Sequence, residues 1–155
     1  MRKAMLLLAV FGLIGSLWAA DPIIGTWKLN VSKSKFAPGQ SIPKEQTDVC
    51  RELDTNLIEC VSKGINADGS AIALTVSWPR QGGIVKIQPP TPDMFSYVET
   101  LVKPGEWYVT FMMNGVQIQL MHKVVSKDGK TGRVTTTGVG LDGKPYETVA
   151  VSDRQ

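Results

Sequence analysis

The sequence contains few residues of the kinds that bind metal ions or act as nucleophiles, with one His and two Cys among 155 residues. Because a structural zinc site uses four ligands, these three side chains cannot complete one by themselves. A Gly-rich phosphate-binding loop, a nucleophile elbow and a paired-acid signature are all missing from the sequence. The sequence therefore predicts a protein with no metal site, no cofactor and no catalytic residue.

The chain has little excess charge of either sign. It contains 17 basic and 14 acidic residues, which gives a formal net charge of +3. Two of the basic residues, Arg2 and Lys3, lie in an N-terminal leader, so the remainder is almost neutral. Such a charge balance gives no electrostatic reason to expect nucleic acid or an anionic membrane as a partner. With 43% hydrophobic residues, the chain is also too apolar to be intrinsically disordered.

The first twenty residues have the layout of a secretory signal peptide. A short basic head precedes an apolar run from Ala4 to Ile14, and the segment Gly15-Ser16-Leu17-Trp18-Ala19-Ala20 leads to a cleavage site expected near Ala20. An uncleaved membrane anchor is the alternative, and the membrane is expected as a partner only through it. We therefore expect residues 1–20 to be a signal peptide and residues 21–155 to form one periplasmic or extracellular domain.

The two cysteines flank a segment that is typical of two strands joined by a turn. If residues 54–56 form this turn, Leu53 lies opposite Leu57 and Cys50 lies opposite Cys60. Directly opposed residues of an antiparallel pair have Cα atoms about 4.5–5.5 Å apart, which is close enough for a disulfide. An oxidising compartment favours a disulfide between Cys50 and Cys60 over the alternative of two free, buried thiols.

Signals for helices are nearly absent from residues 21–155. This part of the chain has 15 Val and 12 Thr but only 7 Leu and 5 Ala, a balance that favours strands. Three segments alternate with a period of two, which is typical of strands with one buried face. Their predicted buried faces are Ile72, Leu74, Val76 and Trp78; Trp107, Val109, Phe111 and Met113; and Val116, Ile118, Leu120, His122 and Val124. A fourth segment, 95–101, alternates in the same way, but its pattern does not show whether the face that carries Glu99 is buried or exposed.

Turn residues separate the expected strands. Asn or Asp followed by Gly occurs at Asp68, Asn114, Asp128 and Asp142, which is typical of turns. The turns of the second half lie about ten to thirteen residues apart, the spacing of an antiparallel meander. The proline-rich segment 88–93 interrupts the pattern because proline has no N–H donor. We predict an all-β, up-and-down antiparallel barrel of about 8–10 strands, with a two-layer β-sandwich as the alternative.

The two ends of residues 21–155 carry a resemblance to a known family. Gly25-Thr26-Trp27 resembles the Gly-x-Trp start of the first strand in lipocalin-like barrels, and the long connection 32–43 resembles their mouth loop. Residues 25–36 and 125–155 together resemble small exported bacterial lipocalin-like proteins of unknown function. The resemblance implies that Trp27 packs across the closed end beside Arg154 of the last strand, with Gly25 completing this base. The chain differs from the family in showing no sign of a C-terminal helix or a helical lid.

The leading functional hypothesis is a non-catalytic barrel that binds a small hydrophobic or amphipathic ligand in its interior. The candidate ligand contacts are Trp27, Trp78, Trp107, Phe111, Met113 and His122. A second hypothesis is a packed envelope or extracellular interaction module without a small-molecule ligand, which would use exposed residues such as Tyr108, Met112 and Met121. A third, an enzyme, rests on His122 alone. An interior void of a few hundred Å³ or an inward-facing charge would favour the first hypothesis. The sequence does not indicate an oligomeric state.

Overall fold

The computed structural model describes residues 21–39, 41–140 and 142–155. The expected signal peptide, residues 1–20, lies outside the described residues. Within the described ranges, no helix is long and apolar enough to cross a lipid bilayer. The only helical element among them is a single 3-10 turn, η1 (Val31–Lys33).

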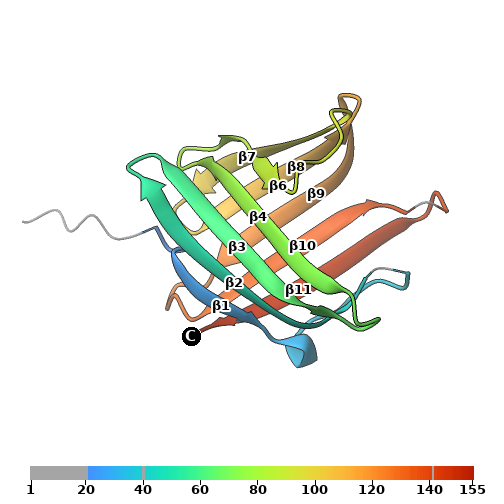
Figure 1. Ribbon diagram of the computed structural model, residues 1–155, viewed down its shortest axis with the longest axis horizontal. Coiled ribbons are helices and arrows are strands. Elements are labelled where there is room, and N and C mark those ends of the chain that lie inside the picture. The colour runs from blue at the N-terminus through green and yellow to red at the C-terminus, as the bar shows by residue number, and fades with distance from the viewer. Residues whose placement is uncertain (1–20, 40, 141) are drawn as a thin grey trace, which may run out of the picture.

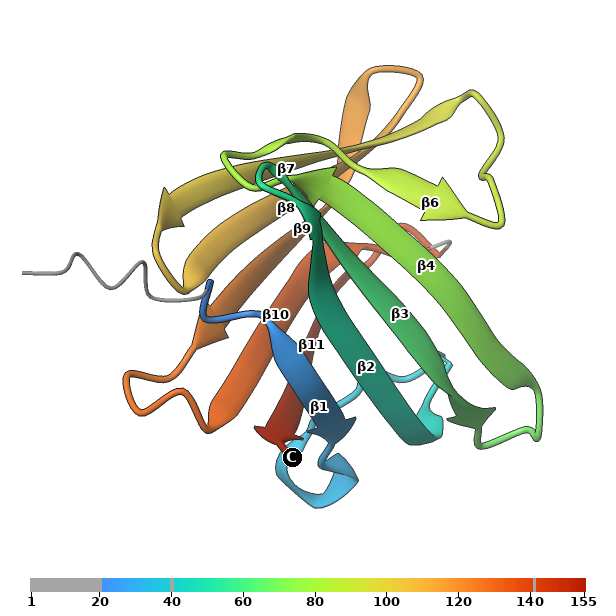
Figure 2. The same cartoon turned by 60° about the vertical axis from the view of Figure 1, so that its left-hand side comes forward.

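In the part of the chain that the structure describes, eleven strands form one antiparallel sheet that curls around a common interior (Figure 1). Most strands pair with their sequence neighbours, and β1 also pairs with β11, which brings the two ends of the domain side by side. Figures 1 and 2 show the strands running obliquely around the interior, with β2 to β4 in front of β9 and β10 in Figure 1. The strands are β1 (Gly25–Leu29), β2 (Pro43–Asp54), β3 (Leu57–Asn66), β4 (Ala71–Pro79), β5 (Gly83–Ile84), β6 (Lys86–Gln88), β7 (Phe95–Lys103), β8 (Glu106–Met113), β9 (Val116–Val125), β10 (Thr131–Val139) and β11 (Pro145–Arg154).

A short segment spanning β5 and β6 completes the wall of the barrel. Its first part pairs with β7, where the Val85 N–H also donates to the Tyr97 carbonyl oxygen at 2.9 Å. Its second part pairs with β4 instead, from Lys86 to Gln88. The prolines that follow cannot donate backbone hydrogen bonds, so the strand ends there. The molecule is therefore a nearly closed antiparallel barrel, as predicted, and not a two-layer sandwich.

One end of the barrel is closed by Trp27. Its indole is 3% exposed, and its Nε1 donates to the Ile23 carbonyl oxygen at 2.7 Å. The Arg154 guanidinium carbon lies 4.7 Å from the indole ring centroid, in the range of a cation–π contact. The same guanidinium donates to the carbonyl oxygens of Pro22 and Ile24 at 2.6 and 2.7 Å. Gly25 has a φ of +141°, and a Cβ there would lie 3.4 Å from the guanidinium carbon, so this close approach suits glycine.

The β2–β3 hairpin carries the predicted disulfide. Cys50 and Cys60 lie opposite each other with their Cα atoms 4.0 Å apart, and their sulfur atoms are bonded. The expected pairing of Leu53 with Leu57 is wrong, because an irregularity between Glu52 and Asp54 places Asp54 opposite Leu57. The turn of the hairpin is therefore one residue shorter than predicted. The predicted pairing of Cys50 with Cys60 is correct.

The predicted inner face of β9 is in fact its outer face. Gln119, Met121 and Lys123 line the interior, whereas Val116 is 65% exposed. The alternation misleads because apolar side chains occupy both faces of this strand, and because a lysine, Lys123, lies inward, where it pairs with Glu99. The expectation that Met121 is exposed is wrong for the same reason.

Candidate functional site

Three adjoining hollows occupy the barrel interior. The largest, the proline-side hollow, has a volume of about 580 Å³ and lies between β4, β7 and residues 89–92. The central hollow, of about 270 Å³, lies beneath Trp27 and the disulfide. The loop-side hollow, of about 340 Å³, lies under the connection between β1 and β2. The central hollow shares lining side chains with each of the other two, so the three hollows adjoin one another along the interior.

The walls of the proline-side hollow are mostly apolar. Strands β4 and β6 contribute aliphatic and indole surface, and three prolines close one side. The members of this wall are Leu74, Val76, Trp78, Val85, Ile87, Pro89, Pro90, Pro92 and Val109. An apolar wall with a few polar groups is the usual construction of a small-molecule site.

The central hollow adjoins the proline-side hollow through four shared residues. These shared residues are Val76, Trp78, Met121 and Lys123. Its remaining wall includes the disulfide and Trp27, which separates the hollow from the closed end. Because the disulfide joins β2 to β3 within this wall, it fixes the spacing of the two strands whose residues Asp48 and Ser62 line the same hollow.

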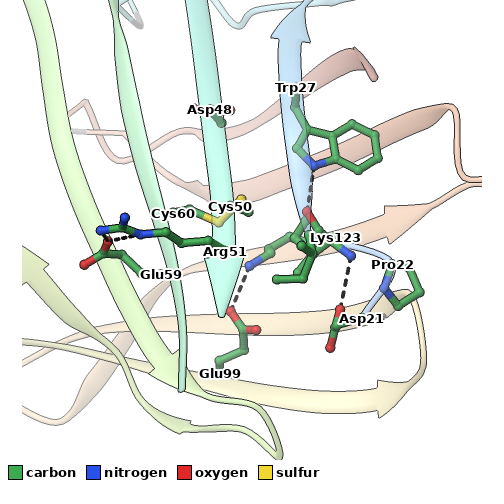
Figure 3. Close-up of a disulfide and its surroundings, with 12 residues drawn as sticks. Asp21, Pro22, Trp27, Asp48, Cys50, Arg51, Glu59, Cys60, Glu99 and Lys123 are labelled. Atoms are coloured by element: carbon green, nitrogen blue, oxygen red, sulfur yellow. Dashed lines mark hydrogen bonds and ion pairs between the residues drawn. A yellow bond between two sulfur atoms is a disulfide. The ribbon is translucent and has the colours of Figure 1, made fainter. Parts of the chain in front are cut away.

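A buried ion pair joins β7 to β9 across β8 on the inner wall, where these two hollows meet (Figure 3). Lys123 Nζ of β9 donates to Glu99 Oε2 of β7 at 2.8 Å. The Glu99 residue is only 2% exposed. The ammonium also lies over two indole rings, 4.5 Å from the Trp78 centroid and 5.9 Å from the Trp107 centroid. Two tryptophans and one carboxylate therefore hold this cation at the floor of the proline-side hollow.

The environment of Glu99 acts on its carboxyl in two opposing directions. Burial raises the pKa of Glu99 above its ordinary value, while the charge and hydrogen bond of Lys123 lower it without cancelling the effect. The Trp78 indole N–H faces the carboxyl as well, but the contact falls outside hydrogen-bonding geometry. Glu99 Oε1 and the Nε1 atoms of Trp78 and Trp107 accordingly have no hydrogen-bond partner among the described residues.

The structure brings most of the predicted aromatic residues to the interior. Trp27 and Trp78 line the hollows, and Trp107 is buried beneath the Lys123 ammonium. Phe111 lies further along the inner face of β8, stacked on Tyr97 with ring centroids 4.3 Å apart. Met113 is the last residue of β8 and is 37% exposed, so it lies at the rim beyond the hollows although it continues the alternation of Phe111. Whether these residues contact a ligand stays a prediction.

His122 lies on the outside of the barrel, so it takes no part in the interior site. Its Nε2 is 2.9 Å from Glu106 Oε1, and its ring stacks on Tyr108 with centroids 4.5 Å apart. Lys103 pairs with the same carboxylate, and this contact and then that of His122 hold the pKa of Glu106 below its ordinary value. The cluster ties β8 to β9 on the outer surface and shows no nucleophile.

Sequence reasoning missed the charged residues of the interior. Glu99 shares its alternation with Phe95 and Tyr97, and this was the available signal, but the pattern alone did not show which face is buried. Asp48 lines the central and loop-side hollows, where Gln46 Nε2 donates to its Oδ1 at 2.8 Å. Neither residue belongs to a metal-binding arrangement, since the described part of the chain has no cluster of three or more potential metal ligands.

Comparisons with known proteins agree with this architecture. No protein-family model matches the sequence, and no curated protein is similar to it at a significant level. Among solved structures, the fluorescent protein UnaG matches with a TM-score of 0.57 and 12% identity, over 86% of this chain and 97% of UnaG.

A point mutant of UnaG gives a TM-score of 0.58 and 13% identity, over 86% of this chain and 96% of the mutant. Lobster apocrustacyanin A1 aligns with a TM-score of 0.47 and 12% identity, over 88% of this chain and 63% of its own. Identities this low establish the fold alone. The comparison with UnaG therefore shows that the chain has the lipocalin-like β-barrel fold.

Proposed function

We propose that the protein is a non-catalytic, exported β-barrel that binds a small hydrophobic or amphipathic molecule in its interior. The observation that carries the proposal is the proline-side hollow, whose volume of about 580 Å³ and mainly apolar wall suit a small organic ligand. Burial contributes about 0.8 kcal/mol for each ligand CH₂ removed from water. Part of this gain is offset by the cost of immobilising the ligand, so we expect micromolar affinity.

Two features support export as part of the proposal. Residues 1–20 have the layout of a signal peptide, and a disulfide such as Cys50–Cys60 forms and persists in oxidising compartments. The sequence resemblance to small exported bacterial lipocalin-like proteins points the same way. Fractionation of the producing cell, with the N-terminus of the exported chain determined by sequencing, tests cleavage near Ala20.

Ligand binding can be tested with Nile red, an uncharged dye whose fluorescence rises in apolar surroundings. We expect the full-length protein to bind the dye with micromolar affinity. Val76 lines both the proline-side and the central hollow, so Val76→Phe places a ring in the space and should weaken binding at least tenfold. Val49→Phe is the matched control, because Val49 lies on the outer face of β2 with 44% of its surface exposed.

Equal binding by the wild type and both variants would show that the dye does not occupy the interior. No binding by the wild type to Nile red, or to a panel of uncharged lipids and pigments, would contradict the proposal and favour the alternative of an interaction module without a small-molecule ligand.

A further inference from the structure

The charges that line the three hollows are few and unbalanced. Among the described residues that line them, two carboxylates, Asp48 and Glu99, and one ammonium, Lys123, are charged. Arg154, the other cation near the central hollow, stacks on Trp27 at the closed end and donates to backbone carbonyls, so it lies beyond the lining. With all three groups ionised, the interior carries one net negative charge.

The single cation of the interior is already engaged. Lys123 Nζ is bonded to Glu99 Oε2 at 2.8 Å, and its side chain is only 17% exposed. A ligand carboxylate placed near Lys123 would therefore lie close to Glu99 too, and in a poorly solvated site two carboxylates in proximity repel each other strongly. Asp48, across the central hollow, adds repulsion of the same sign.

An uncharged head group meets no such obstacle. An ammonium has three N–H donors, and Glu99 accepts only one hydrogen bond from Lys123. A hydroxyl or carbonyl oxygen can accept a hydrogen bond from Lys123 while the ion pair stays intact. A positively charged head group gains attraction from the net negative charge of the wall.

We propose that the barrel interior selects against anions, so that its ligand is an amphiphile with an uncharged or positively charged head group and not a fatty carboxylate. This inference rests on the proposed function, because it specifies the chemistry of the same interior site.

The experiment compares three ligands that share one twelve-carbon chain: dodecanol, dodecylammonium and dodecanoate. Each displaces Nile red from the full-length protein at pH 8 and below its micelle concentration, where the acid is ionised and the amine largely protonated. We expect dodecanol and dodecylammonium to displace the dye at concentrations at least tenfold lower than dodecanoate.

Removing one interior carboxylate should abolish the discrimination. In Glu99→Gln the Lys123 ammonium is left without a charged partner, so we expect dodecanoate affinity to rise at least tenfold relative to dodecanol affinity. Glu147→Gln is the matched control, since Glu147 is exposed on β11 and lines none of the three hollows. Asp48→Asn serves as a second variant, because Asp48 is half-buried and takes part in no ion pair among the described residues.

The outcomes separate the two proposals. Dodecanoate displacing the dye from the wild type as readily as dodecanol would overturn the inference and leave the proposed function standing. An unchanged dodecanoate affinity in the folded Glu99→Gln and Asp48→Asn proteins would do the same, and Asp48→Asn decides the matter if circular dichroism shows Glu99→Gln to be unfolded. Failure of the dye itself to bind would instead contradict the proposed function.

Discussion

At the scale of single residues, the Glu99–Lys123 pair is the most consequential feature of the molecule. Removing two charges from water is costly, and a buried pair recovers this cost only through good geometry and further hydrogen bonds. Here the geometry is good, with 2.8 Å between the charged atoms, but Glu99 Oε1 has no hydrogen-bond partner among the described residues. We therefore regard the pair as part of the site and not as a major source of stability.

Glu99 should make the stability of the protein depend on pH in a defined direction. Because burial raises its pKa in the folded state, the folded chain binds the proton more readily than the unfolded chain, whose Glu titrates near 4.5. Its contribution to the free energy of unfolding therefore increases as the pH falls through the folded-state pKa toward 4.5, and decreases as the pH rises.

Urea unfolding of the wild type and Glu99→Gln at pH 8 and pH 5 measures this contribution. We expect the wild type to gain stability relative to the variant at pH 5. A wild type that loses stability relative to the variant at pH 5 would show that attraction to Lys123 outweighs burial. The control Glu147→Gln, exposed on β11, retains Glu99 and should therefore follow the wild type at both pH values.

At the scale of elements, local sequence patterns predicted which strands form a hairpin better than they predicted which face of a strand is buried. The β2–β3 hairpin was correctly expected around Cys50 and Cys60, because pairing across a tight turn depends only on nearby residues. The predicted inner face of β9 was wrong, since both of its faces carry apolar side chains and the alternation does not show that Lys123 lies inward beside Glu99. Met113 lies outside the hollows because β8 ends there at an exposed position, and nothing in the alternation signals this end.

The disulfide should stabilise the hairpin that carries it. The two cysteines are ten residues apart, for which chain-entropy arguments give about 2–3 kcal/mol, and less where the hairpin already forms in the unfolded chain. We expect the double variant Cys50→Ala/Cys60→Ala to lose about 1–3 kcal/mol of unfolding free energy by urea titration. Arg51→Ala is a neighbouring control and should lose less than about 1 kcal/mol, because the Arg51–Glu59 pair is largely exposed on the arginine side. Equal losses in both would refute a specific contribution from the disulfide.

At the scale of the whole molecule, closure of the barrel depends on the short β5–β6 segment. The composition and turns of the sequence correctly predicted a barrel. They did not predict that one segment would divide its hydrogen bonds between β7 and β4, because such pairing depends on how far the sheet has curled. The sequence likewise did not predict the charged residues of the interior, since Asp48, Glu99 and Lys123 come together only in the closed barrel.

Val85→Pro tests this closure. The substitution removes the N–H that donates to the Tyr97 carbonyl oxygen, so we expect a loss of at least about 1 kcal/mol in unfolding free energy. Amide hydrogen exchange should become faster in β4 and β7, the strands on either side of the segment, and stay slow in β10 and β11. Uniform acceleration in all strands, or none, would show that the segment does not hold the wall together.

The Trp27 cover at one end of the barrel has a kinetic consequence. Because the indole and the stacked Arg154 obstruct that end, a ligand has to enter and leave elsewhere, past residues 89–92 or beneath the connection between β1 and β2. A crosslink that narrows both routes without contacting the ligand would slow association and dissociation by the same factor and leave the equilibrium affinity unchanged.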